Sequence, residues 1–245
     1  MAEYDTIRSV GVGARAEIDE GLRAHMNKVY GLMSVAMVVT AGVAWAVGSS
    51  EQLFSLLRNP VTGQMTILGW IAMFLPLGMV FAFGALINRM SVGAAQLFFY
   101  AFAGAMGLSL AWIFQVFTGV SIASTFLITA IAFAGLSLYG YVTKRDLSAM
   151  GTFLMMGLIG LLVAMIVNMF LGSEPLAWAI SVIGVLIFAG LTAYDTQNIK
   201  NTYLQHAVHG DVEWLGKAAI MGALNLYMDF INLFMFLLQF MGNRE

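Results

Sequence analysis

The stretch Ala218–Met241, AAIMGALNLYMDFINLFMFLLQFM, contains 24 residues and no Lys, Arg, Glu or His. At a rise of about 1.5 Å per residue, a helix of this length crosses a bilayer core of about 30 Å. Its polar residues recur at helical intervals and therefore share one face: Asn225, Asp229, Asn232 and Gln239. A carboxylate in a spanning helix is costly, so we expect Asp229 to face the protein interior, where it has a partner.

The rest of the chain is similarly apolar. It has 245 residues, of which 60% are hydrophobic and 10% charged, and its mean hydropathy is +0.86. This composition is typical of an all-α membrane protein, and apolar runs of about 20 residues exclude a β-barrel, whose strands alternate. The absence of Cys excludes disulfides and thiolate metal sites, and no basic patch indicates a nucleic-acid partner.

Seven apolar runs predict seven transmembrane helices in a single domain, residues 29–241. A cytoplasmic N-terminal tail, residues 1–28, precedes them, and a short C-terminal tail, residues 242–245, follows. We expect the first run to be a permanent span and not a cleaved leader, and Pro76 to kink the second. The runs are Val29–Gly48, Met65–Ile87, Val92–Phe114, Val120–Val142, Thr152–Leu171, Leu176–Tyr194 and Ala218–Met241.

The basic residues predict the orientation of these spans. With the N-terminus in the cytoplasm, Arg58 and Arg244 lie outside and the other nine of the 11 basic residues lie inside, as the positive-inside rule favours. An odd number of spans then places the C-terminus on the outer side. The nine are Arg8, Arg15, Arg23, Lys28, Arg89, Lys144, Arg145, Lys200 and Lys217.

The sixth run carries a second polar face, which continues past its end. Because no Gly or Pro occurs between Asp195 and Gly210, we expect this helix to extend beyond the hydrocarbon edge. Two consecutive helices that each carry a polar face and one Asp are expected to turn those faces toward each other. The residues of this second face are Ser181, Gly184, Phe188, Thr192, Asp195, Asn198 and Thr202.

If the carboxyl groups of Asp195 and Asp229 lie close together, the repulsion between their charges determines the protonation state of the pair. Two full charges about 4 Å apart repel by about 4 kcal/mol at an effective dielectric near 20, so we expect the pair to share a proton near neutral pH. Such a pair responds to pH and, when ionised, forms a weak site for a hard cation such as Ca²⁺. The candidate supporting residues are Asn225, Asn232, Thr192 and Asn198.

Each aspartate also has a simpler interpretation. Asp195 alone is equally well explained as a solvated carboxylate at a helix end, and Asp229 as a protonated residue that serves packing. Small residues in the spans, at Gly104–Gly107 and Gly157–Gly160, indicate close helix approaches, although Gly is common in spanning helices in any case.

Two motifs carry a resemblance to a known family. YDTQNIK at 194–200, followed by LNLYMDFINLFMFLLQF at 224–240, resembles the signature of the Bax inhibitor family, also called transmembrane Bax-inhibitor-motif proteins. The resemblance implies six helices around a central seventh and a location in the bacterial inner membrane. It also implies a pH-sensitive Ca²⁺ leak gated by two aspartates, which correspond to Asp195 and Asp229, with no enzymatic activity and no resident cofactor.

In that family a basic residue at the end of the second helix helps to lock the aspartates. Here the second run ends in INRMS at 87–91, so Arg89 is a candidate latch by location, the alternative being an ordinary positive-inside anchor. The same resemblance leaves open a non-catalytic regulator that binds a membrane protease or another partner. A proton-coupled calcium exchanger is a further alternative.

An intramembrane aspartyl protease also places one Asp on each of two helices. The sequence disfavours it, because Asp229 lies in LYMDF and not in a Gly-x-Gly-Asp setting, where glycines let a substrate backbone approach.

Overall fold

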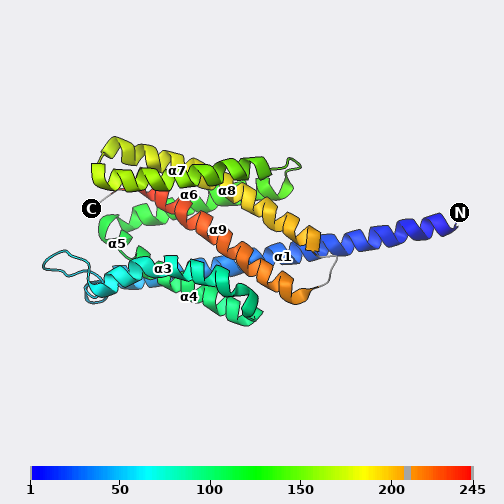
Figure 1. Ribbon diagram of the computed structural model, residues 1–245, viewed down its shortest axis with the longest axis horizontal. Helices are drawn as coiled ribbons and strands as arrows, with labels where there is room; N and C mark the ends of the chain where they lie inside the picture. Colours follow the sequence, from blue (N-terminus) through cyan, green and yellow to red (C-terminus); the bar gives the residue numbers. More distant parts are fainter. Residues whose placement is uncertain (1, 207–210, 244–245) are drawn as a thin grey trace.

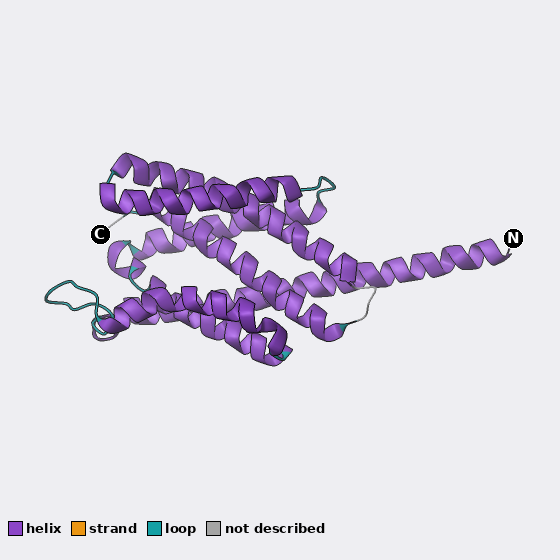
Figure 2. Cartoon of the chain, in the orientation of Figure 1, coloured by secondary structure: helices purple, strands orange, loops and turns teal. Residues whose placement is uncertain are grey.

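The computed structural model describes the backbone of residues 2–206 and 211–243, and the side chains of that part from Ile18 onward. The described part is built of helices without a named β-strand (Figure 2), which confirms the all-α class. In chain order the helices are α1 (Ala2–Gly48), α2 (Glu51–Phe54), α3 (Ile67–Leu86), the 3-10 turn η1 (Ile87–Arg89), α4 (Val92–Leu110), α5 (Ile113–Val116), α6 (Gly119–Val142), α7 (Ser148–Leu171), α8 (Glu174–His206) and α9 (Val212–Met241).

Seven of these helices in the described part are long and apolar enough to cross a membrane, as the seven apolar runs predict. The first helix is longer than its apolar run: α1 is continuous from Ala2 to Gly48 and includes the expected span from Val29. The sixth span, α8, continues to His206 as expected, so Asp195 lies well inside a helix. Helix α3 continues through the buried Pro76 and gives way to a 3-10 turn only after Leu86.

Several helices begin at residues whose side chains accept a hydrogen bond from the first turn. The side chains of Thr66, Ser91, Thr118 and Asp211 accept main-chain N–H bonds at the starts of α3, α4, α6 and α9. These bonds satisfy donors that a helix N-terminus leaves unpaired. At the other end of α7, Gly172 adopts a φ of +60°, a left-handed conformation that ends the helix and that glycine tolerates best.

Helix α9 forms the centre of the bundle. It passes between one group of helices, α6, α7 and α8, and another, α1, α3 and α4 (Figure 1). It packs against α1, α4, α6 and α8, while α3 packs mainly on α4 and α7 mainly on α8. In the most apolar stretch of 18 residues in α9, 67% is buried, which is a larger share than in the matching stretch of the other six described spans. The expected central seventh helix is therefore confirmed.

Glycines allow some helix backbones to approach closely, but only one of those expected does so strongly. A Cβ on Gly107 would lie 2.7 Å from the carbonyl oxygen of Thr40, so α4 and α1 touch there. Gly157 is near Ile187, whereas Gly104 and Gly160 have open space around them, so the expectation was wrong for these two. The tightest backbone-to-backbone contact between the described spans is at Gly140 of α6, where an added Cβ would collide with the backbone of Ala193 in α8.

Candidate functional site

The polar faces of α8 and α9 lie against each other, as expected from their spacing. The hydroxyl oxygen of Ser181, near the start of α8, lies 3.5 Å from Oε1 of Gln239, near the end of α9. Further along, a Cβ on Gly222 of α9 would lie 2.9 Å from the side chain of Ile199. The start of α8 therefore lies beside the end of α9, and the end of α8 lies beside the start of α9, so the two helices run antiparallel.

The two aspartates meet along this antiparallel contact. The carboxyl group of Asp195 lies within hydrogen-bonding reach of that of Asp229, and only 4% of Asp229 is exposed. A hydrogen bond between two carboxyl groups requires a proton on one of them, because an ionised carboxylate only accepts. The second carboxyl oxygen of Asp229, Oδ2, is buried and has no hydrogen-bond partner. The site thus holds a buried acceptor that a proton or a cation can satisfy.

The candidate supporting residues divide into two pairs. Thr192 donates its hydroxyl hydrogen to the carbonyl of Phe188, and Asn232 donates from Nδ2 to the carbonyl of Met228, both at 2.8 Å. These bonds remain within the residues' own helices. A supporting role for Thr192 and Asn232 at the carboxyl pair therefore stays a prediction.

The other two candidates, Asn198 and Asn225, line a cavity of about 250 Å³ with both polar and apolar walls. Asn198 follows Asp195 by three residues and Asn225 precedes Asp229 by four, so the cavity comes within about one helical turn, 5.4 Å, of both aspartates. This cavity lies toward the ends of α1, α8 and α9 that the positive-inside rule places in the cytoplasm. Its other polar lining residues are His25, Asn88, Thr202, Trp214 and Lys217.

Arg89 lies at the end of η1, where its side chain is exposed. Among residues 18–206 and 211–243 one ion pair is found, between Nζ of Lys217 and Oε1 of Glu213 at 2.9 Å. The aspartates thus have no ion-pair partner in the described part of the chain, and the role of Arg89 as a latch stays a prediction. The described residues also contain no cluster of three or more His, Cys, Asp or Glu side chains able to hold a metal ion.

A chain of hydroxyl groups beside Asp195 was not expected from the sequence. Thr196 donates to the carbonyl of Thr192 at 2.8 Å, so its oxygen accepts from Ser137 of α6 at 2.9 Å. Ser137 in turn accepts from the hydroxyl of Tyr30 in α1 at 2.5 Å. The chain joins α1, α6 and α8 at the residue next to Asp195. Only Thr196 lies in a recognisable motif; Tyr30 and Ser137 show no pattern that separates them from other polar residues in spans.

Polar contacts also hold the loop between α6 and α7 to α8, just beyond Asp195. The side chain of Gln197 donates to the carbonyl of Arg145 and accepts from the main-chain N–H of Leu147, both at 2.8 Å. The ammonium group of Lys200 donates to the carbonyl of Tyr141 at 2.7 Å. A movement of α8 at Asp195 would therefore be transmitted to this loop.

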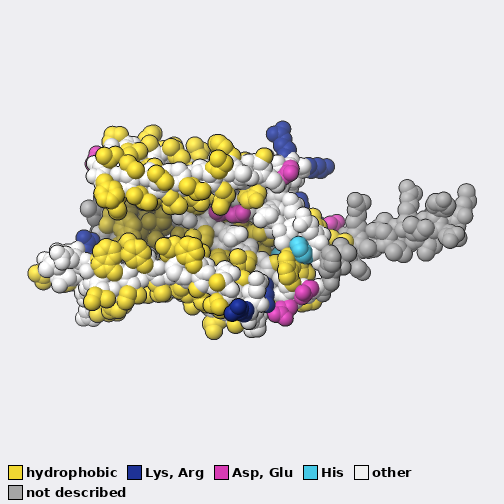
Figure 3. Space-filling model, viewed as in Figure 1, with side chains coloured by type: hydrophobic (Ala, Val, Ile, Leu, Met, Phe, Trp, Pro, Cys, Tyr) yellow, Lys and Arg dark blue, Asp and Glu magenta, His cyan; other side chains and the backbone are white. Residues whose placement is uncertain are grey.

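Fold and site together define a polytopic, all-α membrane protein with a pair of acids in contact at the centre of its helix bundle. Acidic side chains are visible in the recess between the two helix groups, surrounded by apolar and uncharged surface (Figure 3). The apolar outer surface of the bundle matches the seven candidate spans.

Comparison with known proteins places this chain in one family. Residues 22–245 match the family described as "Inhibitor of apoptosis-promoting Bax1". The chain is 46% identical over 225 residues to the inner membrane protein YbhL of Escherichia coli, covering 92% of this chain and 94% of the relative. It is 45% identical over 227 residues to the uncharacterized protein RP147 of Rickettsia prowazekii, and the match covers 93% of this chain and 92% of the relative. The protein belongs to the Bax inhibitor family.

Proposed function

We propose that the protein is a pH-sensitive, calcium-permeable leak channel, without enzymatic activity, gated by the pair Asp195 and Asp229. The observation that carries the proposal is the close approach of these two carboxyl groups, within hydrogen-bonding reach, in the packing of α8 against α9. Loss of the shared proton replaces a hydrogen bond by a repulsion of about 4 kcal/mol at 4 Å and an effective dielectric near 20. A term of this size is enough to shift an equilibrium between two helix arrangements.

Calcium ions are the proposed substrate because the site offers only oxygen ligands, which hard cations prefer. Two carboxyl groups without further acidic or imidazole ligands favour weak binding, and a permeant ion must leave the site as readily as it enters. The cavity lined by Asn198 and Asn225 comes to about one turn from the pair, and in this proposal water and ions reach the pair through it.

The proposed location is the inner membrane of a bacterium, with the N-terminus in the cytoplasm and the C-terminus outside. The location follows the relative in Escherichia coli, whose name describes an inner membrane protein. The orientation follows the distribution of basic residues, nine of 11 on the N-terminal side of the membrane.

The test is calcium flux into dye-loaded liposomes that contain the purified chain, measured over about two pH units around neutrality. We expect the wild-type flux to vary with pH. Asp229→Asn and Asp195→Asn should each flatten that variation, because an amide keeps the shape and a hydrogen bond but cannot exchange the shared proton. The matched control is Glu174→Gln, an exposed acid in the first turn of α8, far along the helix from Asp195.

An unchanged pH profile in both Asp variants would remove the pair from the mechanism. Absence of flux in the wild type, with a stoichiometric partner that co-purifies, would instead support the non-catalytic regulator of a membrane protease. Uphill calcium movement driven by a pH gradient would identify an exchanger.

A further inference from the structure

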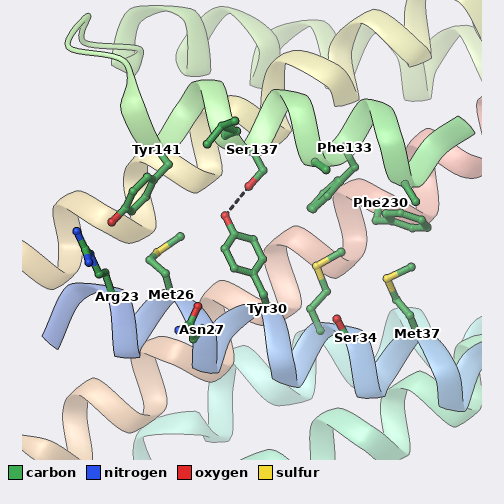
Figure 4. Close-up of a pocket in the computed structure, with 14 residues that line it drawn as sticks. Arg23, Met26, Asn27, Tyr30, Ser34, Met37, Phe133, Ser137, Tyr141 and Phe230 are labelled. Atoms are coloured by element: carbon green, nitrogen blue, oxygen red, sulfur yellow. Dashed lines mark hydrogen bonds between the residues drawn. The ribbon is translucent and has the colours of Figure 1, made fainter. Parts of the chain in front are cut away.

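A long groove separates α1 from α6. These two helices run beside the same central helix but make little direct contact with each other. The space between them is a cavity of about 630 Å³, within the range of about 300–1,000 Å³ typical of ligand sites. Figure 4 shows the 14 residues that line it, which come from α1 and α6 with Phe230 of α9.

The polarity of the groove changes along its length. Arg23 and Tyr141 lie at one end and Met37 and Phe230 at the other (Figure 4). The hydrogen bond from Tyr30 to Ser137 joins α1 to α6 between these ends. Beyond this bond the lining includes Ser34 but is mainly apolar, with Met33, Met37, Ala130, Phe133, Ala134 and Phe230.

The polar end lies at the membrane surface. Tyr141 is in the last turn of α6, which ends at Val142, so Arg23 beside it lies at the level where lipid headgroups begin. Arg23 is exposed and forms no ion pair with a carboxylate in the described residues. A guanidinium group in this position has free donors in a fork that matches the oxygens of a phosphate.

The length of the groove matches one leaflet of a bilayer. From Arg23 to Met37 the helix advances by about 21 Å at 1.5 Å per residue. One leaflet including its headgroup region is about 20–22 Å deep, half of the full thickness of about 40–45 Å. The groove therefore reaches from the headgroup level to near the middle of the membrane, where the neighbouring molecules are lipids.

We propose that the groove between α1 and α6 binds one phospholipid with an anionic headgroup. The headgroup phosphate pairs with Arg23, and one acyl chain lies along Met33, Phe133 and Phe230. Charge complementarity selects the headgroup, because basic side chains on the cytoplasmic side of a membrane attract anionic lipids. This site is separate from the aspartate pair, and its occupancy does not depend on calcium transport.

The test is native mass spectrometry of the full chain in a mild detergent, with phosphatidylglycerol or phosphatidylcholine of identical acyl chains added. We expect one tightly held phosphatidylglycerol per chain and a preference of about fivefold over phosphatidylcholine, from one cationic contact. Arg23→Gln should abolish the preference. The matched control, Lys28→Gln, removes an exposed cation of the same helix that does not line the groove and should keep it.

Two further variants test the apolar part. Ala134→Trp and Ser34→Trp place a large ring in the groove from opposite walls, and both positions are exposed, so neither should disturb folding. Each should weaken the binding of both lipids while the melting temperature stays at the wild-type value. Equal binding of the two lipids by the wild type, or unchanged binding in both Trp variants, would overturn the proposal. So would a dimer that both Trp variants dissociate, because the occupant would then be a second copy.

Discussion

Helices α7 and α9 are both candidate spans of the same bundle, yet apolarity and burial rank them in opposite order. The most apolar stretch of 18 residues in α7 has a mean hydropathy of 2.5, and only 6% of it is buried. The corresponding stretch of α9 has a mean hydropathy of 1.5, and 67% of it is buried. In water the more apolar helix would be the buried one. In a bilayer, lipid solvates apolar side chains as well as protein does, so the helix with polar and small residues occupies the centre.

The contrast extends to what holds each helix in place. Helix α9 contributes side chains to hydrogen bonds with other helices, such as that of Tyr227 with Thr40, and to the carboxyl pair. Helix α7 packs mainly on one neighbour, and most of its large apolar side chains are exposed. Substitutions should therefore have large effects where helix backbones or polar groups meet, and small effects on the lipid-facing side of α7.

The largest expected effect comes from adding one methyl group at a helix contact. Gly140→Ala should lower the free energy of unfolding by about 3 kcal/mol, because the added Cβ collides with the backbone of Ala193. The matched variant on α7, Gly160→Ala, has open space and should stabilise the protein by about 0.5 kcal/mol through its helix propensity. Thermal unfolding in detergent measures both. Equal effects at the two glycines would contradict the contrast between the central contacts and α7.

An intermediate effect is expected from a buried hydroxyl. Tyr227 is fully buried, and its hydroxyl lies 2.7 Å from that of Thr40. Tyr227→Phe should cost about 1 kcal/mol, because Thr40 keeps its bond to the carbonyl of Ala103 and only one interaction is lost. The control, Tyr139→Phe, removes the hydroxyl of a side chain that is 47% exposed and should change stability by less than about 0.5 kcal/mol. A larger loss in the control would show that exposure to lipid does not predict tolerance.

The smallest effect is expected at the loop that leads into α7. The nearby side-chain hydroxyl of Ser148, and then the hydrogen bond that its main-chain N–H donates to Asp146 at 2.9 Å, lower the pKa of this exposed carboxyl below 3.8. A lowered pKa stabilises the fold above the unfolded value, and the contribution is lost as pH falls through the folded pKa. The stability difference between wild type and Asp146→Ala should therefore shrink below about pH 4.

The larger cause of that shift is the hydroxyl of Ser148. Ser148→Ala should therefore remove most of the pH-dependent part of the difference, while the main-chain donor remains. A difference between wild type and Asp146→Ala that stays constant in acid titrations of unfolding would contradict this account.

Much of the fold was predictable because each helix that spans a bilayer must meet the same requirements on its own. A spanning helix must be about 20 residues long and apolar, and both properties are local, so the seven spans follow from the chain alone. The facing of Asp195 and Asp229 was predictable for a similar reason: each lies on a polar helix face, and consecutive spans are neighbours in space. The roles of these aspartates in pH sensing and cation binding stay predictions.

The contacts that the sequence analysis predicted wrongly or did not predict share a physical cause. Gly104 and Gly160 have the same spacing as glycines that do mediate contacts, but they face open space, and the decisive approach is at Gly140. The bond between Tyr30 and Ser137 joins residues 107 positions apart, so no local pattern marks it. Which small or polar residue finds a partner depends on how helices are arranged around α9.

The amino-acid sequence by itself determined the membrane class, the number of spans, the long sixth helix and the two polar faces. These are properties of single helices in contact with water or lipid. Only the tertiary structure decided which glycines touch, which hydroxyl groups pair beside Asp195, and that α1 and α6 stand apart to leave a groove. Those outcomes depend on shape and hydrogen-bond partners contributed by distant segments, and lipid adds no preference for one apolar neighbour over another.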